Sequence, residues 1–240
     1  MSDFFNQGAV PIRSVAYVAR PFERRIIQEV NAGRWVLLLG PRQHGKSTCL
    51  VRLAKQLQLS GVVVASIDLQ RLAPYATYSD LLKQVAIQLA SSIGVTNTEF
   101  SIERRDDLAS WLEFVLPQGE GPIVIMIDEA ASIQNTEFRN SFYGQIRQLS
   151  TARAGANDSE LPARVRFVFA GTFRPESLVD ELNSPFNTCI HIFSEDLSLE
   201  EAKRLIEKVR PDYVSEVESV YKVTGGQPYL LQTIMQEAIC

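Results

Sequence analysis

A glycine-bounded loop between an apolar run and an amphipathic stretch is the feature that most restricts how this 240-residue chain folds. The loop occupies residues 40–47, GPRQHGKS, and fits the pattern G-x-x-x-x-G-K-[ST] at every position. The three leucines before it are typical of a buried strand, and the residues after it are typical of a helix. Because this is the setting in which such a loop wraps around phosphate oxygens, the segment predicts a nucleotide-binding α/β domain.

Each residue type in the loop has a physical role at a nucleotide. The glycines let the chain curl so that successive backbone N–H groups face the phosphates. Lys46 brings a positive charge to the β- and γ-phosphates, Ser47 offers a hydroxyl to Mg²⁺, and the helix N-terminus adds its partial positive charge. Within the loop, His44 is expected to face solvent rather than to act as a catalyst. The predicted nucleotide-binding set is Gly40, Pro41, Arg42, Gln43, His44, Gly45, Lys46, Ser47 and Thr48.

Two acids end another apolar run, IVIMIDE at residues 123–129. A buried strand that ends in this way puts Asp128 and Glu129 at the carboxyl edge of the sheet, where open α/β sheets bind ligands. We expect Asp128 and Ser47 to hold Mg²⁺, and Glu129 to activate the water that attacks the γ-phosphate. Lys46 is expected to take part in catalysis as well. A reading in which the acids only cap a helix is disfavoured by the neighbouring phosphate loop.

A polar strand tip supplies the remaining catalytic candidates. The apolar run 165–170 leads into Gly171-Thr172-Phe173-Arg174. Thr172 and Arg174 both qualify to contact the attacking water or the γ-phosphate, and the sequence does not decide between them. Neither Asn-Lys-x-Asp nor Thr-Lys-x-Asp occurs to read guanine. ATP or ADP with Mg²⁺ is therefore the expected ligand.

The overall pattern predicts a three-layer α/β sandwich with a mainly parallel five-stranded sheet. Nearly all-apolar runs indicate strands that are buried on both faces, and helical stripes such as that of residues 50–57 lie between them. From about residue 196 a capping box, Ser198 with Glu201, opens a small all-helical lobe. We expect an α/β domain over residues 1–195 and a partial helical lid lobe over 196–240, whose last helical pattern runs to Cys240 without a stop signal. The predicted strands are 35–39, 62–67, 123–127, 165–170 and 189–193.

Composition and charge narrow the class of protein. The absence of a long apolar run argues against a membrane span, and three widely spaced cysteines favour a reducing cytoplasm. The net charge of −4 is uneven, because residues 1–60 carry +6 and the remainder carries −10. A basic N-terminal part suits a polyphosphate ligand or a nucleic-acid contact.

With these residues in hand, the chain resembles the STAND branch of P-loop ATPases, within the AAA+-like class, and above all the bacterial AAA-like domain. The resemblance covers nearly all of residues 14–240. It rests on the phosphate loop, on Ile127-Asp128-Glu129, on SVAYVARPFE at 14–23 and on TGGQPYL at 224–230. In the family the fourth strand often ends Thr-Thr-Arg, and the departure here leaves the sensor residue open.

The resemblance implies a slow, regulatory, Mg-dependent ATPase that works as a signalling switch. It places the leading segment with Arg20 near the adenine, and it places Pro228 beside the base, where it couples nucleotide state to lobe angle. It also implies self-association or effector domains, and roles such as bacterial anti-phage defence. Four arginines are indistinguishable candidates for reaching a neighbouring subunit: Arg139, Arg147, Arg153 and Arg164.

Two other functions stay open at this point. A DNA-associated ATPase, such as a loader or a transposition regulator, is favoured by the basic N-terminal part. The sequence pI near 5.4 and the lack of a basic-aromatic stripe oppose it. A small-molecule phosphotransferase is opposed by the acid pair. The trigger, the effector and the oligomeric state cannot be deduced from the sequence.

Overall fold

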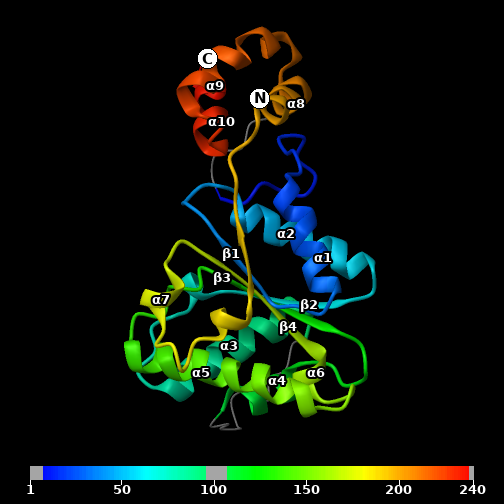
Figure 1. Ribbon diagram of the computed structural model, residues 1–240, viewed down its shortest axis with the longest axis vertical. Coiled ribbons are helices and arrows are strands. Elements are labelled where there is room, and N and C mark those ends of the chain that lie inside the picture. The colour runs from blue at the N-terminus through cyan, green and yellow to red at the C-terminus, as the bar shows by residue number, and fades with distance from the viewer. Residues whose placement is uncertain (1–7, 96–106, 238–240) are drawn as a thin grey trace.

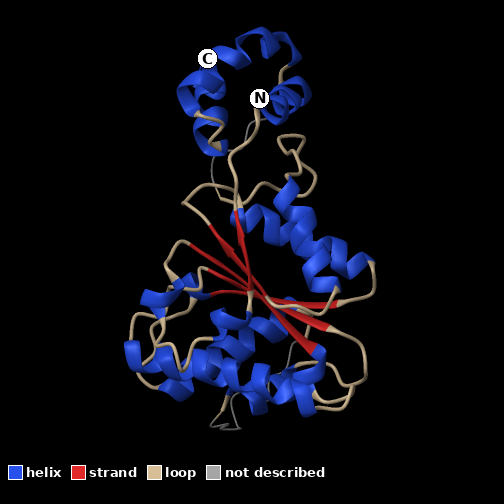
Figure 2. Ribbon diagram, in the orientation of Figure 1, coloured by secondary structure: helices blue, strands red, loops and turns tan. Residues whose placement is uncertain are grey.

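The fold is built on one sheet of five parallel strands, which the computed structural model describes together with the rest of residues 8–95 and 107–237. The strands lie in the order β2-β3-β4-β1-β5 (Figures 1 and 2). This confirms the predicted α/β class, and each predicted strand end lies within one residue of the observed end. The bounds are β1 Val36–Leu39, β2 Val63–Asp68, β3 Ile123–Asp128, β4 Val165–Gly171 and β5 Ile190–Phe193.

Different helices cover the two faces of the sheet, because alternate side chains of a strand point in opposite directions. Val36 and Leu38 of β1 pack in a cluster with α1 and α2, whereas Leu37 and Leu39 belong to the cluster that contains α3, α4 and α5. Figure 1 shows these two helical layers on either side of the strands. The helix bounds are α1 Pro21–Asn31, α2 Lys46–Leu59, α3 Tyr78–Ser92, α4 Leu108–Val115 and α5 Thr136–Ala152.

The strand β5, which was predicted at 189–193, lies at the edge of the sheet, paired only with β1, and its Phe193 is 61% exposed. One expectation about the α/β part is wrong. The sequence of residues 151–163, TARAGANDSELPA, predicts a loop, but the segment contains the end of α5, a 3-10 turn at Arg153–Gly155 and the start of α6 (Leu161–Arg164). A proline in the first turn of α6 suits a helix start, since its missing N–H has no intrahelical partner there.

The C-terminal residues form a helical lobe at one end of the molecule, drawn orange to red in Figure 1. The predicted capping box is present, because Glu201 N–H donates to Ser198 Oγ at 3.2 Å and Ser198 N–H donates to Glu201 at 2.9 Å. Pro228 is the first residue of α10, a position that suits proline because its missing N–H has no intrahelical partner there. The expectation that the helical pattern runs to Cys240 without a stop signal concerns residues outside the described range. The elements are α8 Leu199–Val209, a 3-10 turn Pro211–Glu216, α9 Val217–Thr224 and α10 Pro228–Glu237.

The segment before α1, residues 8–20, joins the lobe to the α/β part. Ala16 and Val18 belong to the buried cluster of the lobe. Earlier in the segment, Val10 N–H donates to Thr48 Oγ1 at 2.9 Å and thereby ties the chain to α2. We call residues 8–20 the leading segment. One short stretch therefore contacts both parts of the molecule.

Candidate functional site

The phosphate loop follows β1 and is tightly enclosed. A Cβ atom on Gly40 would lie 1.8 Å from Ser194 Oγ, and a Cβ on Gly45 would lie 2.8 Å from Arg20 Nη2. Gly45 also has a left-handed φ of 79°, which disfavours any other residue. A Cβ at either glycine would therefore displace a neighbouring side chain, and the backbone conformation of Gly45 adds a second reason for glycine at that position.

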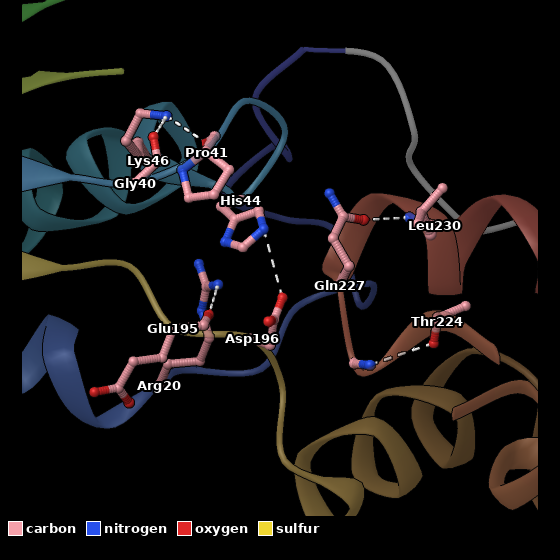
Figure 3. A network of polar contacts seen from close by, with 11 residues as sticks. Arg20, Gly40, Pro41, His44, Lys46, Glu195, Asp196, Thr224, Gln227 and Leu230 are labelled. Atoms are coloured by element: carbon pink, nitrogen blue, oxygen red, sulfur yellow. Dashed lines mark hydrogen bonds and ion pairs between the residues drawn. The ribbon is translucent and has the colours of Figure 1, made fainter. Parts of the chain in front are cut away.

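Lys46 is held at the mouth of this loop. Its ammonium donates to Gly40 O at 2.9 Å and to Pro41 O at 2.6 Å (Figure 3), and to Thr172 Oγ1 at 2.9 Å. Burial lowers the pKa of Lys46, and the charges of Glu129 and Asp128 oppose that shift. The loop thus points a partly desolvated cation at the carboxyl edge of the sheet.

The two acids at the end of β3 are close enough to Lys46 for their charges to affect its pKa. The Ser47 hydroxyl donates to the Asp128 carboxylate, and Glu129 N–H donates to Asp128 Oδ1 at 2.9 Å. Burial raises the pKa of Asp128, although these hydrogen bonds oppose the shift. Glu129 has a φ of 49°, a left-handed conformation that costs a non-glycine residue about 1–3 kcal/mol. Strain of this kind clusters at functional sites, and here it occurs at the predicted base.

The two candidates at the tip of β4 are separated by the structure. Thr172 lies against the loop, since its hydroxyl contacts both Lys46 Nζ and Gly40 O, the latter at 2.8 Å. Arg174 lies at the residue that precedes α7 (Pro175–Leu178), and both Arg174 and Thr172 are exposed and lie outside the lining of the cavity described below. Only Thr172 is therefore brought into contact with the phosphate loop.

A cavity of about 1000 Å³ extends from the loop and the acids to the helical lobe. Its volume lies at the upper end of the range of about 300–1000 Å³ that is typical of ligand pockets. The leading segment and α10 bound one end of it, so three separate parts of the chain enclose one space. Predicted site residues that line it are Arg20, Arg42, Gln43, Gly45, Lys46, Ser47, Thr48, Asp128, Glu129 and Pro228.

Arg20 lines the cavity, but its polar atoms are engaged with the protein. The guanidinium donates to Glu195 O at 2.9 Å and lies 3.5 Å from Glu23 Oε1. It also lies over the ring of Phe22 and against Gly45. Arg20 therefore contacts both the phosphate loop, at Gly45, and the segment between β5 and α8, at Glu195.

The expectation that His44 faces solvent is wrong. His44 is 6% exposed, and its Nε2 lies 3.5 Å from Asp196 Oδ1 in the connection between β5 and α8 (Figure 3). Burial lowers the pKa of His44, while the charge of Asp196 opposes the shift. His44 is not among the residues that line the cavity.

Among the residues that line the cavity and that sequence reasoning missed are Asp68, Gln70 and Arg71, at the end of β2. Asp68 ends β2 and lies in register with Asp128 on β3. It accepts from Gln70 N–H at 3.0 Å and pairs with Arg71 at 3.0 Å. The signal was available, since the run at 62–67 is also followed directly by an acid.

The candidate arginines for intersubunit contact are no longer equivalent. Arg139 donates to Leu178 O and Ile133 O, and Arg164 donates to Gly121 O and Pro117 O. Both guanidinium groups are therefore occupied by backbone oxygens of their own chain. Arg147 and Arg153 are half-buried, and within residues 8–95 and 107–237 neither forms an ion pair with a carboxylate.

The fold and its loop define the class of protein. The chain is similar to a Walker-type ATPase of Pyrococcus abyssi, with a TM-score of 0.66 and 14% identity over 96% of this chain and 69% of that one. It is also similar to the ORC2 protein of Aeropyrum pernix, in complexes with ADPNP and ADP, with a TM-score of 0.55, 12% identity, and coverage of 95% and 62%. The ORC1 protein of the same organism, in complex with DNA, gives a TM-score of 0.52, 14% identity, and coverage of 84% and 52%. The fold is that of the P-loop ATPases.

Within that class, the chain belongs to the AAA-like domain family, whose model matches residues 5–240. It is 29% identical over 245 residues to an uncharacterised WD repeat-containing protein of Synechocystis sp.. That match takes in 95% of this chain and 20% of the relative, so the chain spans about one fifth of the length of the relative. Among the described residues, no helix is long and apolar enough to cross a membrane.

Proposed function

We propose that this AAA-like domain binds ATP with Mg²⁺, hydrolyses it slowly, and works as a nucleotide-dependent switch. One observation carries the proposal: Lys46, Ser47, Asp128 and Glu129 line one cavity that also reaches Pro228 of the helical lobe. The phosphate-binding groups and the lobe therefore share one ligand space. A ligand that fills this space contacts both parts of the molecule.

The residues fit a magnesium-bound triphosphate by their chemistry. The loop amides and the Lys46 ammonium suit phosphate oxygens, and the Ser47 hydroxyl with the Asp128 carboxylate forms an oxygen pair of the kind that Mg²⁺ prefers. The metal supplies charge neutralisation at the phosphates when it is bound. Asp128 and Ser47 are already joined by a hydrogen bond, so the two groups face the same point.

Three side chains would carry the hydrolysis. Lys46 stabilises the negative charge that develops on the γ-phosphate oxygens. Glu129 orients a water molecule and takes its proton, and it directly follows the last residue of β3. We assign the sensor role to Thr172 rather than to Arg174, because the Thr172 hydroxyl contacts both Lys46 and the loop carbonyl of Gly40.

The lobe would respond to the nucleotide through its corner. Pro228 lines the cavity and directly follows the corner Gly225-Gly226-Gln227, in which both glycines have left-handed φ angles. We propose that residues 196–240 act as the lid of this switch, that residues 1–195 form the nucleotide-binding domain, and that lid rotation exposes surfaces for self-association or for an effector. A STAND-type role in bacterial signalling or defence, in the cytoplasm, belongs to the same proposal.

Action on DNA is the competing proposal, and the basic charge of residues 1–60 is the observation that favours it. The structure weakens that observation, since Arg20, Arg34 and Arg52 each have an acceptor within the chain. Retention on DNA that falls steeply with salt would support a DNA-associated ATPase. Lack of retention at low salt would remove it.

The switch is tested by measuring nucleotide content, mass in solution and phosphate release of the purified chain. We expect retained ADP or ATP, Mg-dependent release of phosphate, and a change of size between ADP and a slowly hydrolysed ATP analogue. A protein that binds neither nucleotide would overturn the proposal. Binding and hydrolysis without any change of size would remove self-association and leave the ATPase assignment.

A further inference from the structure

The connection between β5 and α8, residues 194–198, contacts the phosphate loop on one side and the lobe on the other. Ser194 N–H donates to Leu39 O at 2.7 Å, and its hydroxyl fills the space over Gly40. Glu195 O accepts from Arg20, and Asp196 contacts His44 (Figure 3). We propose that His44 is a positioning residue that passes the state of the phosphate loop to the helical lobe through Asp196. This inference rests on the proposed nucleotide switch.

His44 is suited to this role because it belongs to the loop but not to the cavity. Its backbone moves with the loop that wraps the phosphates, whereas its imidazole is buried against the connection. The His44 Nε2 atom lies 3.5 Å from Asp196 Oδ1, and burial lowers the pKa of His44 while the charge of Asp196 opposes that shift. A shift of the loop therefore changes the distance between His44 and the Asp196 carboxylate.

The next residues carry the displacement into the lobe. Leu197 follows Asp196 directly, and its N–H donates to Gly226 O at 2.9 Å. A Cβ on Gly226 would lie 2.1 Å from Leu197 O, so the corner and the connection are in close backbone contact. Two residues later, Pro228 lines the nucleotide cavity. The path from His44 through Asp196, Leu197 and Gly226 thus returns to the ligand space.

The contact between His44 and Asp196 is separate from the contact that Pro228 would make with the nucleotide base. Pro228 would report that a nucleotide is present at the lobe end of the cavity, whereas His44 reports the shape of the loop at the phosphate end. Asp196 is half-exposed, with 49% of its side chain accessible, so it can be changed without opening the core. The two routes are therefore separable by substitution.

The test is amide hydrogen exchange at residues 194–198 and 225–227, without nucleotide and with Mg-ADP or a Mg-bound, slowly hydrolysed ATP analogue. In the unmodified protein we expect nucleotide to slow exchange at both stretches by about tenfold. Asp196→Ala should reduce this effect to less than about threefold while the loop amides of residues 45–48 keep their protection. Asp196→Asn should restore it, because an amide oxygen can still face Nε2.

Two further variants separate transmission from simple packing. His44→Ala, and the double variant His44→Ala with Asp196→Ala, should each reduce the slowing of exchange by nucleotide no more than Asp196→Ala alone does. Substitutions at two residues of one path should not have additive effects. Glu218→Ala is the matched control, since it removes a carboxylate contact with Lys203 inside the lobe, at 2.7 Å, and should leave the response unchanged. If His44→Ala does not fold, the pair Asp196→Ala and Asp196→Asn still decides the question.

Clear results would overturn the inference. An unchanged nucleotide response at residues 194–198 and 225–227 in Asp196→Ala would show that the contact transmits nothing. An equal reduction of the nucleotide response in Asp196→Ala and Asp196→Asn, or additive reductions in the double variant, would also contradict transmission through the contact between His44 and Asp196. By contrast, absent protection of residues 45–48 in the unmodified protein would refute nucleotide binding itself and hence the proposed function.

Discussion

The α/β part and the helical lobe are stabilised in different ways. The α/β part has a large core in which aromatic rings interlock, with Tyr143 and Phe169 both about 5 Å from Phe186, at 5.0 and 5.2 Å. Each such pair adds about 0.5–1.5 kcal/mol beyond simple burial. The cluster of the lobe contains ten buried residues without an aromatic ring, and two of them, Ala16 and Val18, come from the leading segment. The residues that we propose for nucleotide binding and hydrolysis are therefore attached to a large core, whereas the lobe has a small core to which the leading segment contributes.

This difference shows which part is able to move. The groups that we propose for catalysis lie at the ends of strands that are paired on both sides, whereas the lobe is attached through the connection 194–198 and packs on the leading segment. Elements that move in switching are drawn from the less stable regions of a protein. Changes at the phosphate loop should therefore alter ligand binding or chemistry, and changes at the lobe corner should alter local stability.

The largest expected effect is at Lys46. Lys46→Ala removes the cation that contacts Gly40 O, Pro41 O and Thr172, and with it a charge-assisted bond to phosphate. We expect ATP affinity to fall by at least about 100-fold, measured by titration calorimetry. Lys55→Ala, on the exposed side of α2, is the matched control and should leave affinity unchanged. Unchanged ATP affinity in Lys46→Ala would contradict the proposal that the phosphate loop, at the carboxyl edge of the sheet, binds the nucleotide.

Glu129→Gln should separate binding from chemistry. The amide keeps the size of the side chain but cannot take a proton, so hydrolysis should slow by about 100-fold or more while ATP stays bound. Phosphate release and retained nucleotide are measured on the same sample. Glu137→Gln, on the exposed start of α5, serves as the control. Unchanged turnover in Glu129→Gln would mean that another group activates the water.

These two residues also show how far the sequence leads. A strand, a glycine loop and a helix are local signals, so the phosphate loop and the strand bounds were predicted closely. The acids after β3 were predicted to lie at the same edge because parallel strands end together, and both line the cavity as expected. Contacts between distant segments have no local pattern. The burial of His44 against Asp196 and the choice between Thr172 and Arg174 depend on such contacts.

The corner of the lobe allows a sharper comparison within two adjacent residues. Gly225 and Gly226 both have left-handed φ angles, 62° and 84°, but a Cβ on Gly225 meets nothing within 4 Å. Gly225→Ala should therefore cost about 1 kcal/mol through the backbone alone. Gly226→Ala should cost about 2 kcal/mol or more, because its Cβ would collide with Leu197 O.

Chemical denaturation with amide exchange in the lobe would measure both variants. We expect the loss in Gly226→Ala to be concentrated in α8, α9 and α10, with little change in the α/β core. Equal effects of the two substitutions would contradict the close contact at Leu197. A uniform loss across the whole chain would contradict the separate stability of the lobe.

The smallest expected effect on stability is at Asp128, where a substitution that removes the proposed metal ligand should stabilise the fold. Burial raises the pKa of Asp128, so the folded protein binds this proton more tightly than the unfolded chain does. Stability of the metal-free protein therefore rises as the pH falls through the raised pKa toward the ordinary value of 3.8. Asp128→Asn removes the buried charge, so its melting temperature should exceed that of the unmodified protein by about 2 °C at neutral pH.

The difference should shrink in acid, because the unmodified carboxyl group then becomes neutral as well. Mg-dependent hydrolysis should be lost in the same variant. Thermal melts over a pH series without magnesium, together with phosphate release, would measure both effects. A variant that is less stable than the unmodified protein at neutral pH would indicate that the hydrogen bonds from Ser47 and Glu129 outweigh burial. In that case the buried Asp128 carboxylate would not lower the stability of the metal-free protein.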